Sequence, residues 1–306
     1  AREPPGPGRK ERTRFVRVRV QRRRGGTQVR RYDLVAGEFL TPIPMAGTTK
    51  GMDISADGKV LAVANGTSGD NEVYIDFITL KSQKVRRVAF PRASGEGGTH
   101  SVAFDADGKL LVTTRFLGSG WTPLRRYDLA TGLTETLSVG LGLTNAMANP
   151  SPNHRYIAIV EGNNSDGPYG RYTTGDASYQ PSSRLHRSLF EIGVAPNGAQ
   201  LSIPTWSGTY IDDTRRTLPG FGRPGAQTPI GVAYAPSGDV AYFPFALTNY
   251  VAEYDRRTMV ELRRFTTPSL FFYIPSTAFD LGRTKVSPDG KLLFVTVDKG
   301  VFYQEL

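Results

Sequence analysis

A short pattern that recurs six times constrains the fold of this chain more than any other feature. Each copy has an apolar run, a tight turn, most often of Asp-Gly or Asn-Gly type, and a second apolar run. The clearest copies are GMDISADGKVLAVAN (51–65), HSVAFDADGKLLVTTRF (100–116) and RTKVSPDGKLLFVTV (283–297). Glycine adopts the positive φ that such turns need, so each copy predicts two antiparallel strands. The turn positions, spaced 40 to 52 residues apart, are Gly58, Gly108, His154, Gly198, Gly238 and Gly290.

A second pattern follows the first in most copies. In RRYDLATGLTETL (125–137) and RRYDLVAGEFLTP (30–42), a strand ends in Tyr-Asp, a polar turn follows, and another strand begins. AEYDRRTMVELRRF (252–265) and VYIDFITLKSQKVRRV (73–88) fit more loosely, with Asp76 taken as the equivalent of Asp128 and Asp255. One repeat therefore contains four strands. Repeats of this length and content predict an all-β fold, a β-propeller made of four-stranded antiparallel blades.

The repeats resemble those of bacterial β-propellers of the YVTN and YncE type, which are related to the lactonase-type seven-bladed propellers. AYFPFALTNYVAEYDRRTMVELRRF (241–265) carries the likeness best, with a strand, an Asn-containing loop, Val-x-x-Tyr-Asp and a closing strand. The resemblance covers residues 13–306. It implies the fold rather than the function, because the shared residues encode turns and packing.

The repeat count predicts seven blades, with six as the alternative. We expect residues 1–12 to form a flexible basic leader and residues 13–306 to form a single propeller domain. RFVRVRVQRRR (14–24) alternates Arg with Val and is expected to be a strand of an incomplete first blade. The last blade ends before a fourth strand. Residues 162–190 fit the repeat least, and we expect a long binding loop there that tolerates shortening.

Charge is distributed very unevenly along the chain. Residues 1–31 hold twelve basic and two acidic side chains, which accounts for the whole net charge of +10 and leaves the remainder neutral. Arginine suits paired hydrogen bonds to carboxylate, phosphate or sulfate. The leader therefore predicts docking to a protein partner in a larger assembly or to another anionic surface, and nucleic acid would be bound without specificity. The candidate partner-binding residues are Arg9, Lys10, Arg12, Arg14, Arg17, Arg19 and Arg22.

The resemblance to propellers also implies a ligand site at the mouth of the central channel. Such a site is built from the loops that precede the first strand of a blade and those that join its second and third strands. The candidate ligand-binding residues there are His100, Arg115, Trp121, Glu161, Asn163, Asp166, Tyr169, Trp206 and Asn249. Lys50, His100, Asn145 and Lys285 are expected to stand just before first strands.

Several of these candidates have both a functional and a structural interpretation. His100 with Glu161 could form a general-base pair or part of a metal site, or His100 could cap a strand. The oxygen-rich segment 161–166 could bind Ca²⁺, but a solvated loop is favoured. Trp121 and Trp206 could stack on a planar ligand or pack between blades.

The chain has no cysteine, and its three histidines show no metal-ligand spacing. We therefore expect no disulfide, no metal and no cofactor. No apolar run reaches the 18 or so residues of a membrane span. The sequence favours a non-enzymatic scaffold or binding protein in the periplasm or at the cell surface. The alternative is a lactonase- or esterase-like hydrolase with its site at the channel mouth.

Overall fold

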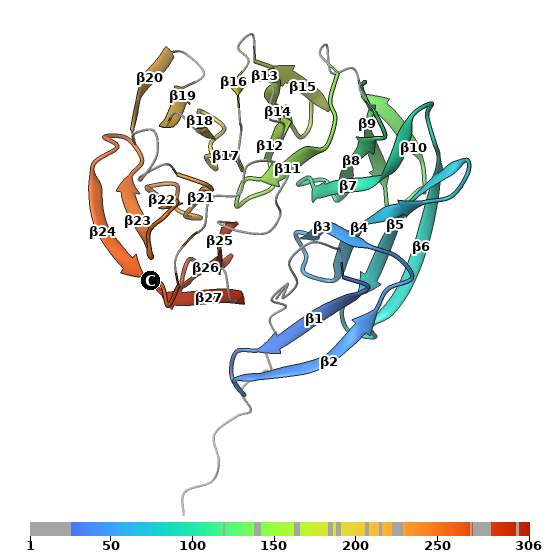
Figure 1. Cartoon of the computed structure of the whole chain (residues 1–306), viewed down its shortest axis with the longest axis horizontal. Coiled ribbons are helices and arrows are strands. Elements are labelled where there is room, and N and C mark those ends of the chain that lie inside the picture. Colours follow the sequence, from blue (N-terminus) through green and yellow to red (C-terminus); the bar gives the residue numbers. More distant parts are fainter. Residues whose placement is uncertain are drawn as a thin grey trace, which may run out of the picture.

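The computed structural model describes residues 26–118, 120–137, 142–161, 166–182, 186–187, 191–205, 208–213, 216–221, 229–269, 271, 283–297 and 300–306. Within these ranges the regular secondary structure consists of β-strands, and no helix is present. Seven successive antiparallel sheets surround a common centre (Figure 1). The predicted β-propeller with seven blades is confirmed. The same residues contain no helix of the length and apolarity needed to cross a membrane.

Five of the sheets have four strands, which are hydrogen-bonded in chain order from the centre of the ring outward (Figure 1). The second to fourth sheets consist of β3 (Thr49–Ile54), β4 (Val60–Ser68), β5 (Glu72–Thr79) and β6 (Lys84–Pro91); β7 (Glu96–Phe104), β8 (Lys109–Phe116), β9 (Leu124–Asp128) and β10 (Thr134–Leu137); and β11 (Ala146–Pro150), β12 (Tyr156–Glu161), β14 (Tyr169–Thr173) and β15 (Ser178–Pro181). The fifth and sixth consist of β17 (Gly193–Val194), β18 (Gln200–Thr205), β19 (Gly208–Asp213) and β20 (Arg216–Phe221), then β21 (Ala233–Tyr234), β22 (Val240–Pro244), β23 (Tyr250–Asp255) and β24 (Glu261–Thr266). A separate short pair joins β13 (Asp166–Gly167) to β16 (His186–Arg187).

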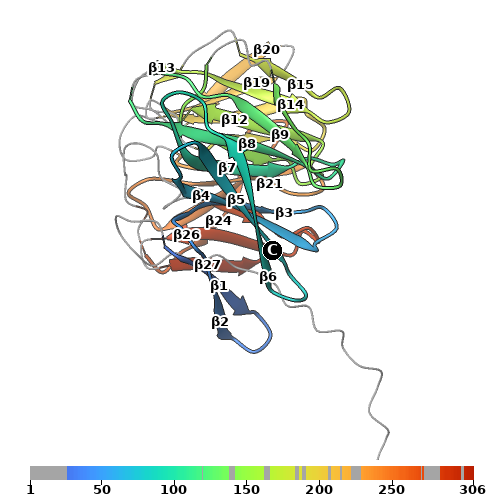
Figure 2. The ribbon, with the colours of Figure 1, turned by 90° about the vertical axis from the view of Figure 1, so that its right-hand side faces the viewer.

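The first and last sheets are incomplete in the described residues, as the repeat count predicts. The first is a hairpin of β1 (Gln28–Asp33) and β2 (Glu38–Pro44), which packs Val29, Ile43 and Met45 against the β3–β6 sheet (Figures 1 and 2). The last has three strands, β25 (Thr284–Val286), β26 (Leu292–Val297) and β27 (Gly300–Glu305). The strand expected at residues 14–24 lies outside the described residues.

The turn between the first two strands of each repeat has the conformation that the sequence predicts. All six turn positions have positive φ, from 59° at His154 to 78° at Gly108 and Gly238. His154 thus occupies a left-handed position that glycine fills in the other copies. The recurring turn motif, which is Asp-Gly in three of its six copies, is a feature of the fold, because it makes the same turn in each of the six repeats.

A second recurring turn joins the third and fourth strands. Asp33, Asp128 and Asp255 each end a third strand, and each Oδ1 accepts two backbone N–H groups of the turn that follows. The alignment of Asp76 with these residues is wrong. Thr79 ends β5, and Asp76 lies buried within that strand, bound to Arg87 and Asn65.

Gly108 offers a clean test of the cost of the turn conformation. A methyl group at Gly108 would meet nothing within 4 Å, so Gly108→Ala adds no collision and only forces alanine to φ 78°. We expect the free energy of unfolding to fall by about 1 kcal/mol, as measured by chemical denaturation. Gly118→Ala is the control: its φ is not positive, its methyl group would make only van der Waals contact with the Phe116 ring at 3.6 Å, and its stability should change little.

The segment 162–190 is not the long loop that the sequence predicts. Within it, β14 and β15 are the third and fourth strands of the β11–β15 sheet. Tyr169 and Tyr172 of β14 are almost fully buried and pack in two different hydrophobic clusters. This stretch was misread because its buried positions are tyrosines set among Gly, Ser and Thr, without the Val, Ile and Leu of the other strands.

Candidate functional site

The innermost strands bring charged side chains to the centre of the ring. Strands β3, β7, β11, β17, β21 and β25 surround this centre (Figure 1). We call the polar and charged residues there the axial cluster. Its members are Lys50, Asp53, His100, Asn149, Glu191, Arg283 and Lys285.

Two side chains of the last sheet reach across the ring. Nη2 of Arg283, just before β25, lies 3.1 Å from Oε1 of Glu191, and its Nη1 lies 3.9 Å from Sδ of Met147 on β11. Lys285 Nζ donates to Oδ1 of Asn149 on β11 and lies 4.0 Å from Glu191 Oε1. Because β11 belongs to the fourth sheet and β25 to the seventh, these contacts bridge the centre.

A pocket opens beside Lys285. Its walls lie on or beside β11, β17, β21 and β25 and present both polar and apolar surface. They are formed by Asn149, Pro150, Pro152, Gly193, Val194, Val232, Ala233, Tyr234, Lys285 and Val286. The Lys285 side chain keeps 46% of its surface open although it lies deep in the ring. Burial lowers the pKa of its amine, and the carboxylates of Glu191 and Asp53 oppose that effect.

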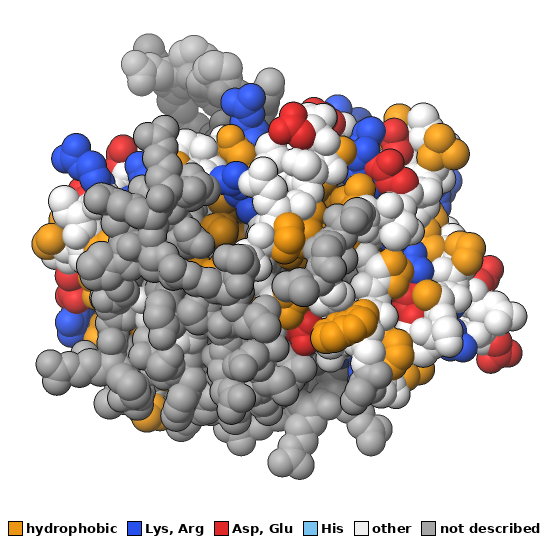
Figure 3. All heavy atoms as spheres, turned by 90° about the horizontal axis from the view of Figure 1, so that it is seen from above, with side chains coloured by type: hydrophobic (Ala, Val, Ile, Leu, Met, Phe, Trp, Pro, Cys, Tyr) orange, Lys and Arg blue, Asp and Glu red, His pale blue; other side chains and the backbone are white. Residues whose placement is uncertain are grey.

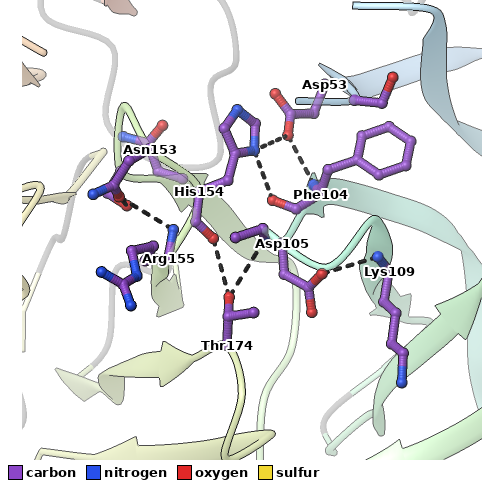
Figure 4. A network of polar contacts seen from close by, with 12 residues as sticks. Asp53, Phe104, Asp105, Lys109, Asn153, His154, Arg155 and Thr174 are labelled. Atoms are coloured by element: carbon purple, nitrogen blue, oxygen red, sulfur yellow. Dashed lines mark hydrogen bonds and ion pairs between the residues drawn. The ribbon is translucent and has the colours of Figure 1, made fainter. Parts of the chain in front are cut away.

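Asp53 forms a polar contact with the neighbouring turn, shown in Figure 4. Its Oδ2 accepts the Phe104 N–H at 2.8 Å, and His154 Nδ1 lies 2.9 Å from the Phe104 carbonyl oxygen, so Nδ1 is assigned as the donor. The same Nδ1 lies 3.9 Å from Asp53 Oδ2. Burial raises the pKa of Asp53, while His154 and Lys285 lower it. His154 therefore joins the second, third and fourth sheets.

His100 of β7 is a buried member of the axial cluster. Its pKa falls to about 3, first because of burial and then because Lys50, Arg115 and Arg283 act on it. A protonated imidazole is unfavourable beside cations and away from water. His100 is therefore neutral at physiological pH and a weak base.

The structure separates the other predicted mouth residues. Arg115 near the end of β8 is exposed, as is Asn249 between β22 and β23. Trp121 is 66% exposed beside Gly142. Glu161 ends β12, is buried, and accepts the Thr144 N–H at 3.3 Å.

One prediction among the mouth residues is wrong. Tyr169 does not face a ligand site, because its ring packs in the core with Met147 and Ile192. Asn163, Trp206 and the leader arginines lie outside the described residues, as does the side chain of Asp166. Of the predicted mouth residues with described side chains, His100 and Arg115 come together.

Sequence reasoning missed Glu191 and Arg283. Both stand one or two residues before an innermost strand. The sequence assigns that position to Lys50 and Lys285, but the structure places these two lysines within β3 and β25. The position of Glu191 and Arg283 relative to the turn glycines could have identified them. Across the described residues, no group of three or more His, Asp or Glu side chains is placed to hold a metal ion.

Comparisons with known proteins support the fold. No protein-family model matches this chain, and no curated protein sequence does so. Among solved structures, hydrazine synthase of Kuenenia stuttgartiensis is similar with a TM-score of 0.67 and 14% sequence identity, over 92% of this chain and 90% of that chain. At this identity the similarity shows the β-propeller fold alone.

Proposed function

We propose that this protein is a non-enzymatic β-propeller that acts outside the cytoplasm as a scaffold or binding protein. It docks an acidic protein partner, or another anionic surface, through its arginine-rich N-terminal strand. The propeller fold suits a scaffold or binding role, because it is a rigid support whose loops and edges can differ between proteins. The periplasm or cell surface remains the proposed location, and cell fractionation would test it.

The distribution of charge carries this proposal. Residues 1–31 contain the entire excess of positive charge, and the rest of the chain is balanced. On the face shown in Figure 3, acidic and basic side chains of the described residues are interspersed without a large area of one sign. A cationic segment on a neutral body attracts an anionic partner at one place.

The properties of His100 weigh against the alternative of a hydrolase. A general base works best when its pKa lies near the working pH. The pKa of His100 is about 3 because burial and three cations disfavour its charged form. The best candidate for a base in the sequence is therefore poorly suited to accept a proton.

Neutralising the leader tests the proposal. We expect the simultaneous change of Arg9, Lys10, Arg12, Arg14, Arg17 and Arg19 to Ser or Gln to abolish retention on heparin and on the native partner. Each exposed contact contributes roughly 0–1 kcal/mol, so the six must change together. Binding is measured by salt elution from heparin and by co-purification, and circular dichroism checks the fold.

A matched control removes the same charge from the body of the protein. The control changes six exposed basic residues to Gln, namely Lys59, Lys81, Lys84, Arg155, Arg257 and Lys291. It should keep most of its retention if the leader is the docking segment. Equal loss in both variants would show that only net charge matters and would contradict the proposal.

A further inference from the structure

Cationic side chains from three sheets converge on His100. Lys50 lies on β3, Arg115 near the end of β8, and Arg283 just before β25. These are the three charged residues that act on the His100 imidazole. Lys50 and Arg115 belong to adjacent sheets, whereas Arg283 comes from the last sheet and is brought to them by closure of the ring.

Close backbone contacts hold this arrangement. A methyl group on Gly51 would lie 2.9 Å from Ser101 Cα and 3.1 Å from the His100 carbonyl oxygen, so glycine lets β3 approach β7. A methyl group on Gly66 would lie 2.8 Å from Lys50 Cε, which places the lysine stem along the β4 backbone. The position of Lys50 beside β7 is therefore fixed by packing.

Arg283 approaches the same place from the opposite side of the ring. Its guanidinium contacts Met147 on β11, the innermost strand next to β7, and pairs with Glu191. Met147 and Glu191 thus fix the position of the Arg283 guanidinium. Arg115 is exposed, so its guanidinium remains accessible to solvent.

We propose that Lys50, Arg115 and Arg283, grouped around His100, form a binding site for a small anion that carries carboxylate or phosphate groups. A guanidinium presents two parallel N–H donors that match either group, and an ammonium adds a charge without geometric demands. The neutral His100 ring offers one hydrogen-bond donor or acceptor. The site is separate from the leader and goes beyond the docking function.

Calorimetric titration of the full-length protein tests the site, with malonate and inorganic phosphate as separate probes at constant ionic strength. We expect saturable binding of at least one probe with a stoichiometry of one, and the better probe identifies the chemical source of the anion. Arg115→Gln removes a charge-assisted pair and should weaken that binding by about tenfold or more. Arg257→Gln removes one exposed arginine from a turn of the sixth sheet and should leave the affinity unchanged.

The histidines provide a second readout. The chain has His100, His154 and His186 only, so their ring resonances can be followed by NMR. A bound anion favours the imidazolium, so it should raise the pKa of His100 from about 3 toward its usual range.

The leader-neutralised variant distinguishes binding of the small anion at this site from binding by the N-terminal leader. The leader-neutralised variant should retain the one-to-one binding of the small anion, whatever becomes of its retention on heparin. The site would be disproved if neither probe saturates, if the titration of His100 does not respond, or if Arg257→Gln weakens binding as much as Arg115→Gln.

Discussion

Replacing Arg125 by alanine is expected to lower the free energy of unfolding by about 3–5 kcal/mol. Arg125 of β9 is buried and donates through Nη2 to Glu96 Oε2 at 2.7 Å and to the Pro91 carbonyl oxygen at 3.1 Å, while Nη1 pairs with Glu96 Oε1. The Glu96 side chain has no exposed surface. The alanine variant leaves this carboxylate inside the protein without its cation. The loss of stability comes mainly from the desolvation of this unpaired carboxylate.

Glu96 also explains why the pair occurs at this place. It stands at the start of β7, accepts the Ala93 N–H at 2.8 Å, and accepts the Thr114 hydroxyl of β8. Pro91 ends β6 of the preceding sheet. The Arg125 guanidinium therefore connects the third sheet to the second through the Pro91 carbonyl oxygen, while the buried Glu96 carboxylate of its own sheet holds it in place.

Two controls isolate the effect of the uncompensated charge in chemical denaturation followed by intrinsic fluorescence. The double variant Arg125→Met with Glu96→Leu removes both charges and should recover much of the lost stability. Arg264→Ala breaks the half-exposed pair with Glu261 and should cost less than about 1 kcal/mol. If Arg125→Ala costs no more than Arg264→Ala, burial of the pair has no energetic consequence and the prediction is wrong.

Deletion of residues 165–182 is expected to abolish folding. The deleted segment contains β14 and β15, and with them the outer half of the fourth sheet. It also contains Tyr172, whose hydroxyl donates to Asp105 Oδ2 at 3.0 Å and accepts from Arg126 Nη1 at 2.9 Å. Loss of one large buried aromatic side chain costs about 3–5 kcal/mol, and this deletion removes three, Tyr169, Tyr172 and Tyr179, together with β13, β14 and β15.

Far-UV circular dichroism and size-exclusion chromatography measure that result directly. Tyr172→Ala serves as a milder companion and should lower the midpoint of thermal unfolding without removing a strand. Tyr172→Phe keeps the ring and loses only the two hydrogen bonds, so its effect should be the smallest of the three. A deletion variant that elutes as a compact monomer with an unchanged spectrum would show that the fourth sheet is dispensable.

The sequence predicts the fold well where the determinants are local. A positive φ at Gly58 or Gly108 is a property of one residue and its neighbours, so the turns can be read directly and the blades can be counted from them. The Asp128 and Asp255 turns are local for the same reason. The alignment of Asp76 is wrong because its strand, β5, ends in Thr79 and not in an aspartate, so the sequence has no Asp that marks the end of this strand.

The candidate site is less predictable because its contacts are long-range. Arg283 meets Met147, and Lys285 meets Asn149, across 136 residues of chain in both cases. No periodicity or motif near either residue reports a partner at that distance. His100 and Arg115 could be nominated from their place in the repeat, but the effect of burial on the charge of His100 could not.

The side chains of Arg283 and Lys285 that cross the ring also bear on the order in which the chain folds. Contacts between residues so distant in sequence form late, since a long stretch of chain must first be ordered. During synthesis the earlier sheets emerge first and can form before the last one exists. Until residues 283–285 arrive, Glu191 and Asn149 lack the cations that they meet in the finished ring. The contacts at the centre of the ring are thus completed only when the β25–β27 sheet is in place, so the pairing of Glu191 and Asn149 with their cations depends on the folding of that sheet.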